Sequence, residues 1–218
     1  MDLRLTPPPY PLSDEQSLLA RQPEIRARLA TSRRLLHWQG QGGIPLFGEA
    51  FGTADAERAV LLVCGRVESC IKYDELSDEL VQLGYAVYRF DHRGQGLSGR
   101  LLADHHKGHI DSYAAAVADL QQICSSIRPH HRQLFLLAHS MGGCISALLL
   151  QQANTPAITA AALCAPMVRL RSGPLPHWLA WLLVNLHHII ADGSSMHVLI
   201  DEFARLYTHF CEQPCDRT

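Results

Sequence analysis

The stretch that decides the fold runs from Leu134 to Leu150 and reads LFLLAHSMGGCISALLL. Its first part is a short, continuous apolar run, which is typical of a strand buried on both faces. Its last part is a longer apolar segment that suits a helix. The junction, Ala138-His139-Ser140-Met141-Gly142, fits the small-x-Ser-x-Gly pattern of a sharp strand-to-helix turn that carries a nucleophilic serine.

The residues around Ser140 are suited to such a turn. Ala138 and Gly142 are small enough to avoid collisions between flanking side chains, and Gly143 gives further room. Alanine in place of the commoner glycine is a mild departure. A helix beginning at Met141 would direct N–H groups toward the hydroxyl and favour an oxyanion. The alternative is a serine that caps a buried helix, but the strand–turn–helix context favours a nucleophile.

Apolar runs alternate with segments of helical spacing on both sides of this turn. We expect strands at 44–52, 58–65, 85–91, 133–138 and 158–166, and helices at 73–84, 111–127 and 141–153, with one or two more between Ser13 and Trp38. On the helix at 111–127 the spacing predicts one buried face formed by Tyr113, Val117, Leu120 and Cys124. This alternation predicts an α/β protein with a mostly parallel sheet and flanking helices. Ser140 would lie at the carboxyl end of an inner strand, where such sheets bind ligands.

The 218 residues suggest three segments. Residues 1–40 are expected to form a loose segment and helix, 41–170 the core, and 171–218 a helical cap or lid. The stretch from Leu175 to Ile190 is the most apolar part of the cap, but it falls short of the roughly 18 apolar residues that a spanning helix needs. It is expected either to pack over the core or to contact a membrane surface.

Composition excludes several classes of protein. With 47% hydrophobic residues and a formal net charge of −2, the chain is neither disordered nor a basic nucleic-acid binder. The seven cysteines are odd in number and no secretory signal opens the chain, which predicts a cytoplasmic protein with free thiols, peripheral at the inner membrane if the cap contacts lipid.

Two further loops follow expected strands. Gly65 lets the backbone come close to a ligand, and the backbone N–H of Arg66 would be a second oxyanion donor, unless this is an ordinary strand-to-helix loop. Asp91 and Arg93 lie in a glycine-bearing loop, which they are expected to brace rather than serve in chemistry. No Gly-Lys-Ser/Thr follows, so this is not a phosphate loop.

No cofactor or metal is predicted. Residues 105, 106 and 109 are histidines, but no carboxylate or cysteine is placed to complete a metal site, and a solvated loop is expected. His209, Cys211 and Cys215 match no zinc spacing either.

Several segments together resemble the bacterial lysophospholipases of the α/β-hydrolase superfamily, the branch allied to monoacylglycerol lipases. The matching segments are GRVESCIKYDEL (65–76), FDHRGQGLSGRLLAD (90–104), GHIDSY (108–113), LLAHSMGGCIS (136–146) and CAPM (164–167). The resemblance implies a hydrolase that cleaves the acyl ester of lysophospholipids or monoacylglycerols. It implies Ser140 as nucleophile, the amides of Arg66 and Met141 as oxyanion hole, and a helical cap after Pro166.

The acid and histidine of the triad stay unknown. In this fold they follow the serine, each after a further strand, and we expect a truncated chain that lacks those strands. The candidates by residue type are Asp192, His197, Asp201 and His209. Asp119 is excluded because it is expected to face outward from its helix, and His139 because it lies in the turn.

Three functions remain open at this point. The first is an ester hydrolase whose activity is impaired by the missing partners of the serine. The second is a catalytically silent remnant that binds acyl lipids, and the third is an acyltransferase that uses the same serine. The sequence leaves the head group, the acyl length and the oligomeric state open.

Overall fold

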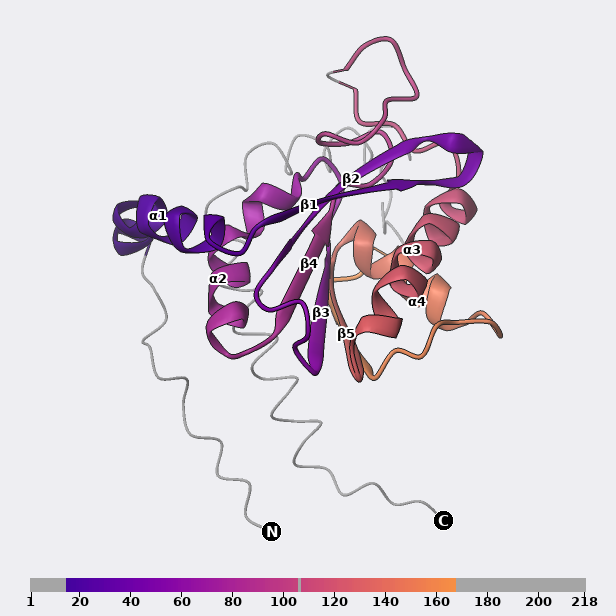
Figure 1. The fold of residues 1–218 in the computed structure, drawn as a ribbon. Helices are drawn as coiled ribbons and strands as arrows, with labels where there is room; N and C mark the ends of the chain where they lie inside the picture. Colours follow the sequence, from indigo (N-terminus) through magenta and orange to yellow (C-terminus); the bar gives the residue numbers. More distant parts are fainter. Residues whose placement is uncertain (1–14, 106, 168–218) are drawn as a thin grey trace.

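The computed structural model describes residues 15–105 and 107–167, and the description below refers to these (Figure 1). Six strands form one sheet in the order β1-β2-β4-β3-β5-β6. The strands are β1 (Arg34–Gln39), β2 (Pro45–Phe51), β3 (Arg58–Val63), β4 (Ala86–Phe90), β5 (Gln133–His139) and β6 (Ala160–Cys164).

The prediction of a mostly parallel sheet is confirmed. Strand β3 pairs in parallel with both β4 and β5, and β5 pairs in parallel with β6. Strands β1 and β2 are antiparallel to their neighbours. The apolar runs of β3 and β4 are buried along almost their whole length, as expected for strands covered on both faces.

Helices cover both faces of the sheet. They are α1 (Glu15–Ala30), α2 (Asp74–Gln82), α3 (Tyr113–Ile127) and α4 (Met141–Leu150), with short 3₁₀ turns η1 (Gln41–Gly43), η2 (Cys70–Tyr73) and η3 (Arg128–His130). Figure 1 shows α1 and α2 on one side and α3 and α4 on the other. Each side has its own core, with Ile25 and Leu80 in the first and Leu120 and Ile145 in the second.

The expected helix across 13–38 ends earlier than predicted. Helix α1 stops at Ala30, and β1 occupies Arg34–Gln39 in antiparallel register with β2. Side chains of β1 alternate between half-buried and exposed, because successive residues of a strand face opposite sides. Trp38 packs over Gly48 of β2, where a Cβ would come within 2.5 Å of the indole ring. The leucine spacing therefore suggested a helix where cross-strand packing favours a strand.

The buried face predicted for α3 is partly wrong. Val117, Leu120 and Cys124 are buried as expected, but Tyr113 is 41% exposed at the first position of the helix. The first turn of α3 contacts the core through Ala115 and Ala116 instead.

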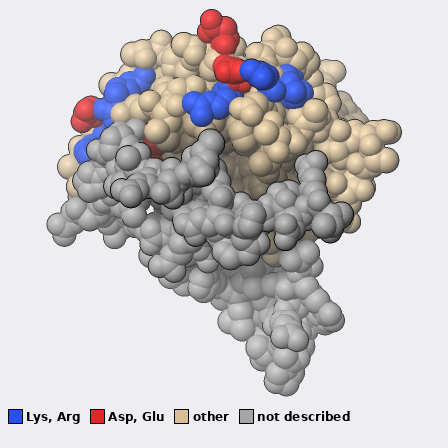
Figure 2. Space-filling view, turned by 90° about the horizontal axis from the view of Figure 1, so that it is seen from below, with Lys and Arg blue, Asp and Glu red and all other residues tan. Residues whose placement is uncertain are grey.

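Surface charge is mixed on the face seen in Figure 2, where Lys and Arg side chains lie beside Asp and Glu. Within the described ranges, no helix has both the length and the hydrophobicity that crossing a membrane requires. The division at residues 40 and 170 stays a prediction, and the segment 171–218 with its expected cap helix lies outside the described residues.

Candidate active site

Ser140 is the single residue between β5 and α4, so the predicted sharp turn is confirmed. Its backbone has φ 50° and ψ −114°, a conformation that residues other than glycine seldom adopt. Three hydrogen bonds hold it there. Its N–H donates to Cys164 O at 3.0 Å, and its carbonyl oxygen accepts from Cys144 N at 3.1 Å and Met167 N at 3.0 Å. Strain held in this way is common where a side chain must be presented to a substrate.

The small residues of the turn make room for neighbouring strands. A Cβ on Gly142 would lie 2.5 Å from Val63 O at the end of β3 and would also overlap Cys64 O. A Cβ on Gly143 would lie 3.1 Å from Pro166 Cα, and Ala138 is fully buried. The sequence alone suggested that small side chains are needed because of crowding within the turn. The structure shows that the need comes largely from the backbone of β3 and from the segment after β6.

The β3 exit loop (residues 64–69) is held by the carboxylate of Glu68, whose side chain is 10% exposed. Glu68 Oε2 accepts from Gly65 N at 2.6 Å and from the Tyr73 hydroxyl at 2.7 Å. Glu68 Oε1 lies 3.1 Å from Lys72 Nζ and 3.1 Å from His139 Nδ1. This carboxylate therefore joins the loop to the residue that precedes Ser140.

The carboxylate of Glu68 is ionised in this setting. Burial disfavours the charge, but the hydrogen bond and charge of His139, the Tyr73 hydroxyl and the charge of Lys72 together lower the Glu68 pKa to about 2. Glycine is favoured at position 65, because a Cβ would come within about 3 Å of the side chains of both Glu68 and His139, which would then have to shift. Burial also raises the pKa of Tyr73, which stays a neutral donor.

The β4 exit loop (residues 91–99) packs against the β3 exit loop. Gln95 is 3% exposed, and its amide nitrogen donates to Gly65 O at 3.1 Å. Its amide oxygen accepts from Val67 N at 2.7 Å. Val67 has φ 58°, which is strained for a β-branched residue, so these bonds stabilise an unfavourable backbone.

Asp91 braces the β4 exit loop, as predicted. Its carboxylate accepts from Leu97 N at 2.8 Å within the loop and from Cys70 N at 2.7 Å at the start of η2. Gly96 has φ 49° and lies so close to this carboxylate that a Cβ would overlap it. Ser98 adds a bond from its hydroxyl to Asp91 O at 2.5 Å.

Arg93 also braces the loop, but its partner contradicts one expectation. Asp119 does not face outward from α3: it is 1% exposed and pairs with Arg93 through two bonds, Nε to Oδ2 at 2.7 Å and Nη2 to Oδ1 at 2.9 Å. Asp119 also accepts from Gln41 N at 2.7 Å. Ala116 and Ile123, three and four positions from Asp119, lie on the same face of α3 and are also buried. The buried face of α3 therefore includes Asp119.

His92 bonds the residue that follows β3, close to the turn that carries Ser140. It is fully buried, and its Nε2 lies 3.0 Å from Cys64 O. Burial lowers the His92 pKa to about 4, so near pH 7 the ring is neutral and Nε2–H donates to the carbonyl. Cys64 O is one of the two carbonyls against which Gly142 packs.

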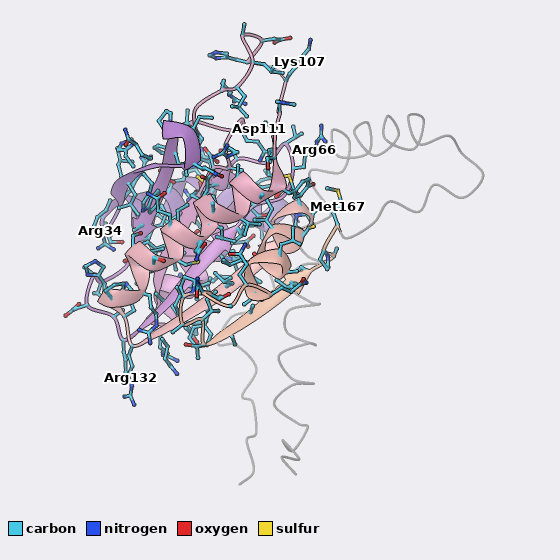
Figure 3. The ribbon with its side chains drawn as sticks, turned by 90° about the vertical axis from the view of Figure 1, so that its right-hand side faces the viewer. Arg34, Arg66, Lys107, Asp111, Arg132 and Met167 are labelled. Atoms are coloured by element: carbon cyan, nitrogen blue, oxygen red, sulfur yellow. The ribbon has the colours of Figure 1, made fainter. Side chains whose placement is uncertain are left out.

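Arg66, one of the two predicted oxyanion donors, lies at one end of the molecule. Figure 3 shows Arg66 and Met167 at the end where Asp111 also lies, with Arg132, which precedes β5, at the opposite end. The donor roles of the Arg66 and Met141 amides stay predictions. His105 and His109 are exposed, as expected for a solvated loop, and His106 lies outside the described residues.

The candidates for the triad acid and histidine also lie outside the described residues: Asp192, His197, Asp201 and His209. Sequence reasoning missed two polar residues that hold the loops: Glu68, whose side chain is largely buried, and Gln95, which is fully buried. Gln95 had a signal, since it stands between two glycines in a loop that follows a buried strand.

Comparison with known proteins decides the family. The family described as serine aminopeptidase, S33 (Hydrolase_4) matches residues 54–205. The chain belongs to this family. A curated relative, lysophospholipase L2 of Escherichia coli (strain K12), is 44% identical over 163 residues, which cover 72% of this chain and 47% of that protein. Monoglyceride lipase of Rattus norvegicus is 32% identical over 117 residues, covering 52% of this chain and 37% of that protein. The chain thus spans about half the length, or less, of these relatives.

Solved structures confirm the fold of this Hydrolase_4 member. An esterase of Pyrococcus furiosus aligns with a TM-score of 0.55 at 18% identity, covering 72% of this chain and 65% of the esterase. A thioesterase domain from the curacin biosynthetic pathway aligns with a TM-score of 0.53 at 17% identity, covering 74% of this chain and 55% of the domain. At such identities the likeness concerns the fold, which is that of an α/β hydrolase.

Proposed function

We propose that the protein is a serine hydrolase of carboxylic esters of the lysophospholipase type and that it acts through an acyl-enzyme on Ser140. The observation that carries this proposal is the conformation of Ser140, alone between β5 and α4 at φ 50° with all its backbone partners in place. Membership of the Hydrolase_4 family and the names of the relatives support it.

The proposed reaction has two steps. Ser140 Oγ attacks the ester carbonyl while its proton passes to a base, and the carbonyl oxygen becomes an oxyanion. The oxyanion then collapses, the bond to the glycerol-bearing alcohol breaks, and the alcohol takes the proton from that base. Water then cleaves the acyl-serine ester and releases the fatty acid. The N–H groups of Arg66 and Met141 would stabilise the oxyanion in both steps.

A serine hydroxyl needs a base to be nucleophilic near neutral pH. We assign this base and its carboxylate to none of the described residues. His139 is engaged with Glu68 through Nδ1, and Asp119 is engaged with Arg93. Asp192, His197, Asp201 and His209 remain the candidates.

The proposed substrates are monoacyl lipids, with lysophospholipids preferred to monoacylglycerols because lysophospholipase L2 of Escherichia coli has the higher identity of the two relatives described. A cytoplasmic location and contact of residues 175–190 with a membrane surface belong to the same proposal. The substrate would reach Ser140 from such a surface.

A fluorophosphonate probe tests the proposal. We expect it to label the folded protein at Ser140, as mapped by mass spectrometry of peptides, and we expect release of fatty acid from a palmitoyl lysophospholipid to exceed release from monopalmitoylglycerol. A folded protein that binds the lipid, takes no label and releases no fatty acid would instead be an acyl-lipid-binding protein. Transfer of the acyl group to an added alcohol would indicate an acyltransferase.

A further inference from the structure

The oxyanion donor proposed on the β3 exit loop is a backbone N–H, whose direction no side chain of its own residue can set. The N–H of Arg66 and the carbonyl of Gly65 belong to one peptide unit. That unit is planar and trans, so the carbonyl and the N–H point in opposite directions. Whatever fixes the Gly65 carbonyl therefore fixes the Arg66 N–H.

Gln95 fixes that carbonyl. Its amide nitrogen donates to Gly65 O at 3.1 Å, and it lies 3.4 Å from Glu68 O in the same loop. Its amide oxygen accepts from Val67 N at 2.7 Å. The two peptide units on either side of Arg66 are thus both held by the two ends of one side-chain amide.

The support behind Gln95 is rigid. Its own N–H donates to His92 O at 3.0 Å, its carbonyl accepts from Ser98 N at 3.0 Å, and the residue is 3% exposed. The Asp91 carboxylate accepts from Leu97 N within the same loop and from Cys70 N of η2. The amide of Gln95 consequently has little freedom to follow the β3 exit loop if that loop rotates.

The held conformation is an unfavourable one. Val67 has φ 58° although its side chain is β-branched, and a free loop would relax toward negative φ. Relaxation at Val67 would rotate the Arg66–Val67 peptide unit, which is joined through the Arg66 Cα to the unit that carries the Arg66 N–H. Strain kept in place by specific hydrogen bonds beside a reactive residue is a way to pre-organise a site.

We propose that Gln95 is a positioning residue that aims the Arg66 N–H at the oxyanion by holding the peptide units on both sides of Arg66. This inference rests on the proposed function, since it requires the Arg66 N–H to serve as oxyanion donor. Gln95 itself touches neither substrate nor the reacting atoms, and its effect is transmitted through the backbone.

The test measures phosphonylation of Ser140 by a fluorophosphonate in the full chain, with intact mass as readout and the probe concentration varied. Gln95→Leu keeps a similar volume and removes all three bonds of the amide. Loss of one oxyanion donor costs roughly 10²- to 10³-fold in rate in known hydrolases, so a misdirected donor should lower the maximal rate of phosphonylation by about tenfold or more. The probe concentration giving half-maximal rate should change less than about twofold, because only the transition state uses the donor.

Ser98→Ala is the matched control. Ser98 lies in the same loop and is equally buried, and its hydroxyl donates to Asp91 O and accepts from Phe47 N on the side away from Gly65. The Ser98→Ala substitution should lower the thermal unfolding midpoint without changing the phosphonylation rate of the folded protein. If Gln95→Leu does not fold, Gln95→Asn, which keeps the amide but is too short to reach both partners, takes its place with the same expected result.

The outcomes separate the two proposals. If wild-type protein is not labelled at Ser140, the proposed function fails. If wild-type protein is labelled and the folded Gln95 variant reacts at the wild-type maximal rate, the positioning role is wrong while the proposed function stands. If Ser98→Ala slows the reaction as much as Gln95→Leu, the effect is general loosening of the loop, and the positioning role is again wrong.

Discussion

Two buried side chains of the β4 exit loop, two positions apart, hold different parts of the molecule. Arg93 pairs with Asp119 on α3 and donates to Gln41 O in η1, so it joins the loop to a helix and to the turn between β1 and β2. Gln95 bonds Gly65 O and Val67 N, so it joins the same loop to the backbone beside Ser140. Both are buried and polar, yet only the Gln95 side reaches the proposed site. Burial and hydrogen bonding alone therefore do not distinguish residues that maintain the fold from residues that shape the site.

Ser140→Ala should give the largest effect on activity and almost none on the fold. Loss of the nucleophile should lower fluorophosphonate labelling and fatty-acid release by about 10³-fold or more. The free energy of unfolding should change by less than about 1 kcal/mol, since the hydrogen bonds that hold Ser140 come from its backbone.

Ser146→Ala is the control for that substitution. Ser146 is buried on α4, the helix that follows Ser140, and in the described part of the structure its hydroxyl has no hydrogen-bond partner. Its removal should leave labelling unchanged and stability equal or higher, because an unsatisfied buried hydroxyl is lost. Persistent activity in Ser140→Ala, or its loss in Ser146→Ala, would contradict the assignment.

Asp119→Ala should destabilise the fold most. It leaves the buried Arg93 guanidinium with only one carboxylate contact, the longer one to Asp111 at 3.4 Å, and it removes the acceptor of Gln41 N. Breaking a buried pair typically costs about 3–5 kcal/mol, and the remaining Asp111 contact places the expected loss toward the lower end. The labelling rate of the folded fraction should stay within about twofold of wild type. Chemical denaturation measures the first quantity and intact mass the second. A large loss of labelling at unchanged stability would show that the Arg93 side also shapes the site.

Glu68→Gln should destabilise the protein in a pH-dependent way. The carboxylate has a pKa of about 2 in the folded protein against an ordinary value near 4.5, so it contributes stability above pH 4.5, about 3 kcal/mol in order of magnitude. That contribution is lost as the pH falls from about 4.5 to about 2. The difference in unfolding free energy between wild type and Glu68→Gln should therefore be large near pH 7 and narrow over that interval.

Glu57→Gln serves as the control for the pH series, because Glu57 pairs with Arg132 at the surface. Its difference from wild type should be small and flat over the same pH range. A flat difference for Glu68→Gln as well would mean that its carboxylate is not held in the charged form by His139, Tyr73 and Lys72.

Arg132→Ala should have the smallest effect. The side chains of Arg132 and Glu57 are 80% and 62% exposed and lie where β5 and β3 begin, at the end of the sheet opposite Ser140. Exposed pairs of this kind contribute little, so the unfolding free energy should change by no more than about 0.5 kcal/mol and labelling not at all. A marked loss of either would contradict the small contribution expected of an exposed pair at this end of the sheet.

Much of the fold could be predicted from the sequence, because it depends on local pattern. Apolar runs gave β3, β4 and β5, and the five residues around Ser140 gave the turn. The strand β1 was missed because its partner β2, not its own spacing, decides its conformation. Asp119 was placed wrongly because its burial depends on Arg93, which comes from a loop far away in the sequence.

The site was predicted less completely than the fold. Ser140 and Gly65 carry local signals, since one fits a turn motif and the other a close backbone approach. The roles of Glu68 and Gln95 depend on which loops meet at the carboxyl end of the sheet, and that follows from the strand order β4-β3-β5. A single sequence shows that a glutamate and a glutamine are present in these loops, but it does not show which residues they bond.

Trapping of the acyl-enzyme tests the central claim most directly. The protein is mixed with a palmitoyl lysophospholipid, quenched with acid at short times and digested, and the peptides are measured by mass spectrometry. We predict a palmitoyl ester on the peptide that contains Ser140, absent from Ser140→Ala. Fatty-acid release with no adduct at Ser140, or an adduct on another residue that survives Ser140→Ala, would contradict it.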